Sequence, residues 1–312
     1  MWIAQLAVHT GVMSRYVHPP HSRLRPDSVP PHLWFGVSAV FHYLGPSFAV
    51  LLFPAVGVLG VAWFRIASAA LIFAPVTRPW RVIRRADMAE RWLLLSLGAV
   101  LAVMNTAFYL ALDRLPIALV AAIEFVGTLA LAAMGANSLR NWGALILSLA
   151  GVALLIGIDP AMSGAHMALA DPLGLAWACL NGALFVLYVA LGHRAARTGA
   201  AGGIERLGAA MFIAALLIFP VGLGQAVAAF GSPLLVLAGL GVGLCSSVIP
   251  YVCDQFAMAR LPRASFALLL SLLPAMAAVI GVIVLRQVPG PAEVAGIALV
   301  MAAVALHRPT PI

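Results

Sequence analysis

Ten long apolar runs constrain this chain more than any other feature of its sequence. Each run has roughly the 17 to 25 residues that an α-helix needs to cross a bilayer. Backbone groups in lipid must be hydrogen-bonded within the segment, and the runs lack the alternation of barrel strands, so we expect helices. The runs are 32–54, 57–76, 92–112, 116–135, 139–158, 171–192, 204–223, 233–257, 262–285 and 291–307.

The composition indicates an all-α integral membrane protein and no nucleic-acid partner. Hydrophobic residues make up 63% of the chain and charged residues 9%, whereas soluble domains have about 25% charged residues. The net charge of +8 comes from arginines scattered between the apolar runs, so we interpret them as topology charges. Cys179, Cys245 and Cys253 lie in apolar runs without metal-ligand spacing and are expected to be reduced.

The two halves of the chain repeat each other. Arg-Leu-Pro-Ile-Ala at 114–118 returns as Arg-Leu-Pro-Arg-Ala at 260–264, 146 residues later. Each half has five runs, an odd number, so the second copy is expected to cross the membrane upside down. Inverted repeats are typical of secondary transporters, whose site lies near mid-membrane. The same interval matches Ala111, Arg114, Leu115, Pro116, Ala118, Ala121, Ala132 and Gly135 with Ala257, Arg260, Leu261, Pro262, Ala264, Ala267, Ala278 and Gly281.

The arginines predict the orientation. With the amino terminus inside, 15 arginines lie on the inner side and two, Arg114 and Arg286, on the outer side, as the positive-inside rule predicts. We therefore expect both termini in the cytoplasm. The expected domains are a flexible cytoplasmic tail (1–31), a first five-helix repeat (32–158), an outer linker (159–170), a second five-helix repeat (171–308) and a cytoplasmic tail (309–312).

Two charged residues lie well inside apolar runs. Glu124 is near the middle of the fourth run, where an ionised carboxylate costs several kcal/mol unless it is paired or faces water. Such residues mark proton sites or substrate pathways, or they hold helices together. Arg65 lies inside the second run, and it pairs with Glu124, receives an anionic group of a substrate or reaches to an interface.

Neutral polar residues within the runs indicate either a polar cavity or hydrogen bonds between helices. Asn105 and Tyr109 lie four residues apart on one helical face, so they line a polar cavity or form interhelical hydrogen bonds. His42 and Asn181 lie at comparable depths in the first helix of each half. A lone histidine can titrate near neutral pH, but it is more often a packing residue.

Asp254 follows Tyr251 by one helical turn, close to the inner end of the eighth run. Arg260 and Arg263 lie just beyond it. We expect an interfacial ion pair with one of these arginines more than a proton relay.

The chain lacks the sequence motifs of several enzyme classes. It has no Walker A loop, no HExxH motif and no GxSxG elbow. We therefore expect no enzyme activity, no direct use of ATP and no cofactor.

Several short motifs in a fixed order resemble the drug/metabolite transporter superfamily with two EamA-type five-helix repeats. The closest likeness is to the threonine/homoserine exporter subgroup, and it extends from about Trp34 to the end of the chain. The motifs are Trp63-Phe64-Arg65, Arg78-Pro79-Trp80-Arg81, Met104-Asn105 with Phe108-Tyr109, Leu115-Pro116, Glu124-Phe125, Gly174 with Trp177, Pro250-Tyr251, Arg260-Leu261-Pro262 and Pro274-Ala275.

The resemblance implies a carrier of the bacterial inner membrane that exports amino acids or related metabolites through a central cavity built from both repeats. From the inverted duplication and the buried carboxylate we add the hypothesis of alternating access in exchange for protons through Glu124. The implied substrate-binding or coupling residues are Arg65, Asn105, Tyr109, Glu124, Tyr251 and Asp254. The chain departs from the pattern at Thr128 in place of proline, at Leu273 in place of an acid before Pro274, and at Arg286-Gln287 in place of Gly-Glu.

Two alternative functions stay open at this point. One is efflux of drugs or toxic compounds, which predicts a wider cavity lined by aromatic and Met side chains and little dependence on Arg65. The other is a non-transporting membrane scaffold or sensor, in which the polar residues only hold helices together. The expected partners are a small-molecule substrate and the lipid bilayer, and the protein is a monomer or a homodimer.

Overall fold

The computed structural model describes residues 29–136, 138–156, 171–196, 200–261, 269 and 273–306, and these residues contain helices and no strand. The helices all belong to one compact unit, Pro31–Ile312. They are α1 (Pro31–Val56), α2 (Val58–Thr77), α3 (Pro79–Arg85), α4 (Met88–Leu112), α5 (Ile117–Ala136), α6 (Leu139–Ile156), α7 (Pro172–Ala196), α8 (Ala200–Ala226), η2 (Val227–Gly231), α9 (Pro233–Gly243), η3 (Leu244–Val248), α10 (Ile249–Met258), α12 (Leu273–Leu285) and α13 (Pro291–Leu306).

Helices lie within each of the ten expected ranges. Six are long and apolar enough to cross a membrane by length and composition, and four shorter apolar helices accompany them. The ninth range is described from Leu273 onward, apart from Leu269. The linker at 159–170, the last tail and nearly all of the first tail lie outside the described residues, so these expectations stay predictions, as do the ten crossings and their directions.

Two elements were not expected from the apolar pattern. α3 is a seven-residue helix between the second and third runs, with Pro79 in its first turn, where the missing N–H costs nothing. The eighth run is also not one regular helix, because the π-helical segment η3 separates α9 from α10. Such segments are often found at functional sites.

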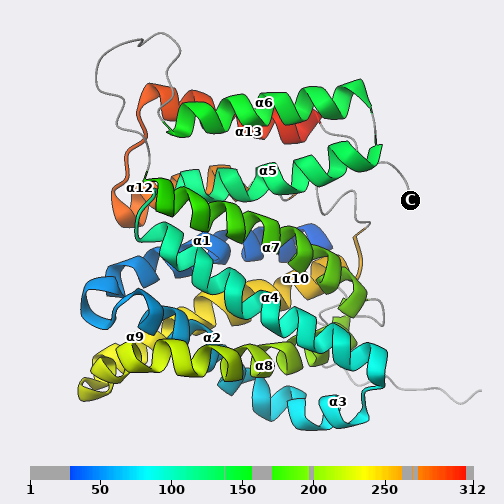
Figure 1. Cartoon of the computed structure of the whole chain (residues 1–312), viewed down its shortest axis with the longest axis vertical. Coiled ribbons are helices and arrows are strands. Elements are labelled where there is room, and N and C mark those ends of the chain that lie inside the picture. Colours follow the sequence, from blue (N-terminus) through cyan, green and yellow to red (C-terminus); the bar gives the residue numbers. More distant parts are fainter. Residues whose placement is uncertain are drawn as a thin grey trace, which may run out of the picture. The chain divides into compact units, whose positions relative to one another are not determined.

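Close helix pairs connect the two halves of the chain (Figure 1). α2 packs on α8, α5 on α12, and α6 on α13. Glycines allow the last pair to approach closely: a Cβ at Gly151 would lie 2.6 Å from the Gly296 carbonyl oxygen, and a Cβ at Gly296 would lie 2.7 Å from that of Gly151. Small residues at membrane-helix contacts permit this backbone approach.

The remaining contacts between the halves form matched sets. α4 packs on α7, and α10 packs on α1 in the same relation. α5 also packs on α7, while α12 packs on α1. Both first helices, α1 and α7, therefore lie against the third and fourth apolar helices of the other half.

Candidate functional site

A hydrogen bond between equivalent positions of the two halves lies at the centre of the site. The Tyr251 hydroxyl on α10 donates to Asn105 Oδ1 on α4 at 3.1 Å, across the 146-residue interval of the repeat. Asn105 Nδ2 donates to the Leu101 carbonyl at 2.6 Å. Both Asn105 and Tyr251 are buried. Asn105 therefore forms an interhelical hydrogen bond, which was one of its two alternatives, and its contact with substrate stays a prediction.

Arg65 lies on α2 beside this contact and is buried among polar groups of η3. Its Nε donates to Ser247 Oγ at 3.1 Å, and its Nη2 donates to the Ser246 carbonyl at 3.0 Å. Pro250 has no N–H to offer the carbonyl four residues earlier, so the Ser246 oxygen is left for Arg65. Sequence reasoning missed both serines, since neutral hydroxyl groups barely change the hydropathy of a run.

The Arg65 guanidinium also faces aromatic rings. Its Cζ lies 5.2 Å from the ring centre of Tyr109 and 5.7 Å from that of Phe108, distances typical of cation–π contacts. The Tyr109 hydroxyl lies 3.5 Å from Ser246 Oγ. Arg65 Nη1 is buried and has no hydrogen-bond partner among the described residues.

Two of the alternatives for Arg65 are wrong in this structure. The side chain is 3% exposed, so it does not reach to an interface. It also forms no ion pair with Glu124, because the ion pairs within the described ranges are Arg114–Asp171 and Arg206–Glu90.

Glu124 lies on α5 and is buried against α7. Asn181 Nδ2 donates to Glu124 Oε2 at 3.2 Å. Gly182 makes this contact possible, since a Cβ there would lie 3.2 Å from Glu124 Cα. The Asn-Gly dipeptide in an apolar helix is the sequence signal for this partner, but the sequence alone does not place it opposite Glu124.

Asp254 lies on α10 and is also buried. Ser38 Oγ on α1 donates to Asp254 Oδ1 at 2.5 Å. The expected ion pair with Arg260 is not formed: Asp254 belongs to neither ion pair of the described residues, and Arg260 Nε donates to the Phe256 carbonyl at 3.3 Å. Arg263 lies outside the described residues. The carboxyl is more than one helical turn from the end of α10, and Ser38 meets it there.

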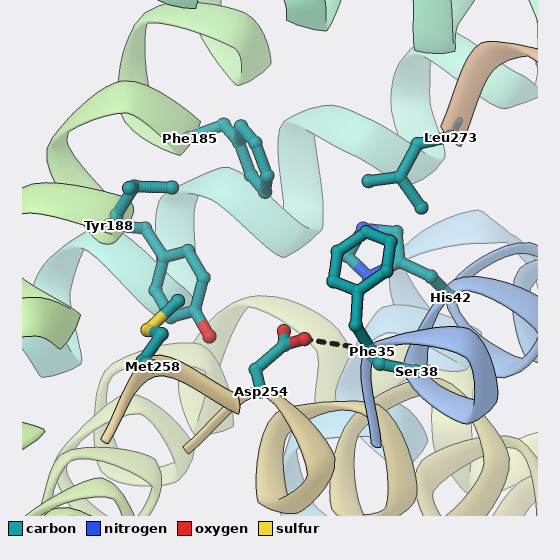
Figure 2. Close-up of a pocket in the computed structure, with 9 residues that line it drawn as sticks. Phe35, Ser38, His42, Phe185, Tyr188, Asp254, Met258 and Leu273 are labelled. Carbon is teal, nitrogen blue, oxygen red and sulfur yellow. Dashed lines mark hydrogen bonds between the residues drawn. The ribbon is translucent and has the colours of Figure 1, made fainter. Parts of the chain in front are cut away.

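Asp254 faces a small cavity between α1, α7, α10 and α12 (Figure 2). Its volume of about 10 Å³ is room for about one water molecule. The buried Tyr188 hydroxyl has no hydrogen-bond partner among the described residues. Leu273, which stands where the resemblance led us to expect an acid, also lines the cavity. The lining residues are Phe35, Ser38, His42, Phe185, Tyr188, Val189, Asp254, Met258 and Leu273.

Ion pairs hold helix ends together away from this centre. Arg114 Nη1 donates to Asp171 Oδ2 at 2.6 Å, and the Leu173 N–H donates to Asp171 Oδ1 at 3.0 Å. The Arg114 guanidinium and then the Leu173 N–H hold the pKa of Asp171 below its usual range, and the bond to Asp171 raises the pKa of Arg114. Arg206 Nε donates to Glu90 Oε1 at 2.7 Å.

Comparisons with known proteins identify the family of the chain. A model of the EamA-like transporter family matches residues 172–307. The threonine/homoserine exporter RhtA of Escherichia coli K12 is 34% identical over 259 residues, which cover 83% of this chain and 84% of the exporter. RhtA of Salmonella typhimurium SL1344 is 35% identical over 243 residues, covering 78% and 79%.

A solved structure supports the same fold. A crystal structure described only as that of a protein has a TM-score of 0.57 and 18% sequence identity, and the match covers 88% of this chain and 96% of that one. The identity and coverage of the RhtA relatives show the family. The chain therefore belongs to the EamA-like transporters of the drug/metabolite transporter superfamily, in the subgroup that resembles the RhtA exporters.

Proposed function

We propose that this protein is a secondary-active exporter of amino acids or related small metabolites in the bacterial inner membrane. Its relatives are named threonine/homoserine exporters. The observation that carries the proposal is the buried Arg65, which keeps one unpaired nitrogen beside a contact between the two halves. A buried donor without a partner is costly, so a substrate carboxylate that fills it binds favourably.

The helix contacts support two inverted five-helix repeats. If a two-fold axis exchanges the halves, the contact of α4 with α7 must match that of α10 with α1, and both occur. Equivalent residues touch each other only near such an axis, as Asn105 and Tyr251 do. A site on this axis can open to either side of the membrane when the halves rock against each other.

The cavity beside Asp254 limits what this conformation can hold. Room for about one water molecule is too little for an amino acid. Transport therefore requires α1 and α7 to move away from the helices that they cover, and this conformation is a closed one. The contacts of Ser38 with Asp254 and of Asn181 with Glu124 are the ones that such movement breaks.

We assign proton coupling to Glu124. Its described hydrogen-bond partner is the neutral amide of Asn181, and neither ion pair of the described residues includes Glu124. The closed site disfavours the charged carboxyl, and opening to water restores it. A carboxyl that alternates between the closed site and a site open to water can carry a proton in exchange for substrate.

Transport by the purified protein tests the proposal. Proteoliposomes loaded with labelled threonine or homoserine should release it when a pH gradient is imposed, and protein-free liposomes should not. Glu124→Gln keeps the size of the side chain and an oxygen for Asn181, but it cannot titrate. Normal transport with unchanged pH dependence in this variant would exclude Glu124 as the coupling group, and no movement of any amino acid would favour a scaffold or sensor.

The cavity lining favours one second candidate, efflux of drugs or toxic compounds. The cavity has an aromatic and thioether wall, as that function predicts, but in this conformation it lacks the predicted width; the residues of this wall are Phe35, Phe185, Tyr188 and Met258. Resistance of a deletion strain separates the two functions. Loss of tolerance towards dyes supports drug efflux, and loss of tolerance towards amino-acid analogues supports amino-acid export.

A further inference from the structure

We propose that α3 carries a binding site for the headgroup of an anionic phospholipid. Three of its side chains, Arg81, Arg84 and Arg85, line a hollow of about 280 Å³ on the surface, and we refer to them as the α3 arginine cluster. All three are exposed. The site is separate from the central polar groups and does not depend on the transport function proposed above.

The packing of α3 fixes which face it presents. Val82 and Ile83 pack against Ala86, Leu94 and Ala209, and α3 lies against α8 (Figure 1). The arginine cluster is therefore left facing outward. α3 also connects α2 and α4, each long and apolar enough to span a bilayer, so it lies where the hydrocarbon meets the headgroups.

No arginine of the cluster forms an ion pair with a described residue. Glu90, the closest acid in sequence after Asp87, bonds to Arg206. Guanidinium groups match phosphate oxygens in geometry and bind them through paired hydrogen bonds. A phosphodiester in the hollow would therefore relieve the repulsion among three like charges.

Apolar neighbours favour a lipid over a free phosphate ion. Trp80 is 47% exposed and Val76 is 78% exposed, and both lie beside the cluster in sequence. Tryptophan is enriched at membrane interfaces, where its ring contacts acyl chains and its N–H reaches water. A soluble phosphate gains nothing from these side chains, whereas a phospholipid uses the arginines and the apolar surface together.

A second hollow gives room for the alcohol part of the headgroup. Arg81 and Arg85 also line a groove of about 470 Å³, together with Glu90 and Glu205. Carboxylates accept hydrogen bonds from hydroxyl groups. The groove therefore fits phosphatidylglycerol, with its phosphate at the arginines and its glycerol hydroxyls toward the acids.

Lipid binding by the full-length protein tests the site. The purified protein is titrated with phosphatidylglycerol or phosphatidylcholine carrying brominated acyl chains, and quenching of tryptophan fluorescence is measured. Subtracting the signal of Trp80→Phe isolates the lipid beside α3. We expect phosphatidylglycerol to bind at least about tenfold more tightly than phosphatidylcholine, and the difference to shrink as salt is raised from about 0.1 M to about 1 M.

Two triple variants of equal charge provide the control. The first variant combines Arg81→Gln, Arg84→Gln and Arg85→Gln. It should weaken phosphatidylglycerol binding at least about tenfold, because the phosphate loses all three donors. The control variant combines Arg140→Gln, Arg194→Gln and Arg286→Gln. It removes the same charge elsewhere and should leave phosphatidylglycerol binding unchanged. Equal binding by both triple variants overturns the proposal, as does equal binding of the two lipids by the wild type. Displacement of phosphatidylglycerol by an equal concentration of inorganic phosphate would also overturn the lipid assignment.

Discussion

Glu124 and Asp254 are both buried carboxyls, but their surroundings differ. Each accepts a hydrogen bond from a neutral side chain on the first helix of the other half: Asn181 for Glu124, and Ser38 for Asp254. Glu124 is held where Gly182 brings two helix backbones together, whereas Asp254 faces a cavity with room for about one water molecule. Similar partners therefore create one tightly packed site and one site that can take in water.

The two carboxyls also stand at positions where the sequence repeat is not kept. The two halves share turns and helix contacts, but Glu124 corresponds to Leu270, and Phe108 corresponds to Asp254. The repeated positions provide the architecture, and we propose that the unmatched polar residues provide the chemistry. A carrier with one carboxyl in each setting can use them for different tasks.

The largest effect is expected from filling the contact at Gly182. Gly182→Leu places a side chain where even a Cβ lies 3.2 Å from the Glu124 backbone, so α5 and α7 must separate. We expect a loss of about 1–3 kcal/mol of stability and of most transport activity. Thermal melting of the purified protein and efflux from proteoliposomes measure the two effects.

Gly143→Leu is the matched control, because a Cβ at Gly143 would meet no atom within 4 Å. It should melt at or above the wild-type temperature. If the two leucine variants behave alike, the close contact of α5 with α7 is not what holds Glu124.

A smaller and unequal effect is expected from removing the two hydrogen-bond donors. Asn181→Leu leaves Glu124 without its donor in a closely packed contact, which should cost about 1–3 kcal/mol. Ser38→Ala removes the donor to Asp254 but enlarges a cavity that can admit water, so the loss should be below about 1 kcal/mol. Melting of both variants in the same detergent compares them, and an equal loss would remove the distinction between the two sites.

The smallest effect is expected at Asp171, a partly exposed carboxyl that contrasts with the two buried ones. Its pKa is lowered by Arg114 and by the Leu173 N–H, so the bond stabilises the fold above about pH 4, the usual pKa of an aspartate. This contribution is lost as the pH falls through the lowered pKa. Asp171→Asn should therefore melt slightly below the wild type at pH 7, and the difference should disappear in acid. A difference that grows in acid would contradict this sign.

The sequence predicted which ranges form helices better than it predicted which side chains contact each other. Long apolar runs are local features, so the ranges of helices such as α2 and α4 followed from them. The partners of Glu124 and Arg65 did not, because they depend on which helices pack together and on neutral side chains that hydropathy does not register. Ser246 lies in the π-helical segment η3, and its carbonyl is left for Arg65 because Pro250, four residues later in α10, has no N–H; no periodicity revealed that.

α3 and the partner of Asp254 are two further features that the sequence pattern did not predict. Seven residues between apolar runs are too few to give a periodic signal, so α3 was missed although its arginines were counted. Asp254 was expected to pair with Arg260 because the two are close in sequence. Ser38, 216 residues away, meets it instead, and only the packing of α1 on α10 creates that contact.

Proton-coupled transport by Glu124→Gln and Asp254→Asn shows which of the two buried carboxyls couples transport to protons. Each variant is reconstituted with labelled threonine, and export driven by a pH gradient is compared with exchange of labelled for unlabelled threonine at equal pH. We predict that Glu124→Gln loses gradient-driven export by about 100-fold while exchange continues, and that Asp254→Asn still responds to the gradient. Gradient-driven export that survives Glu124→Gln but disappears in Asp254→Asn would instead place the coupling group at the cavity beside Ser38.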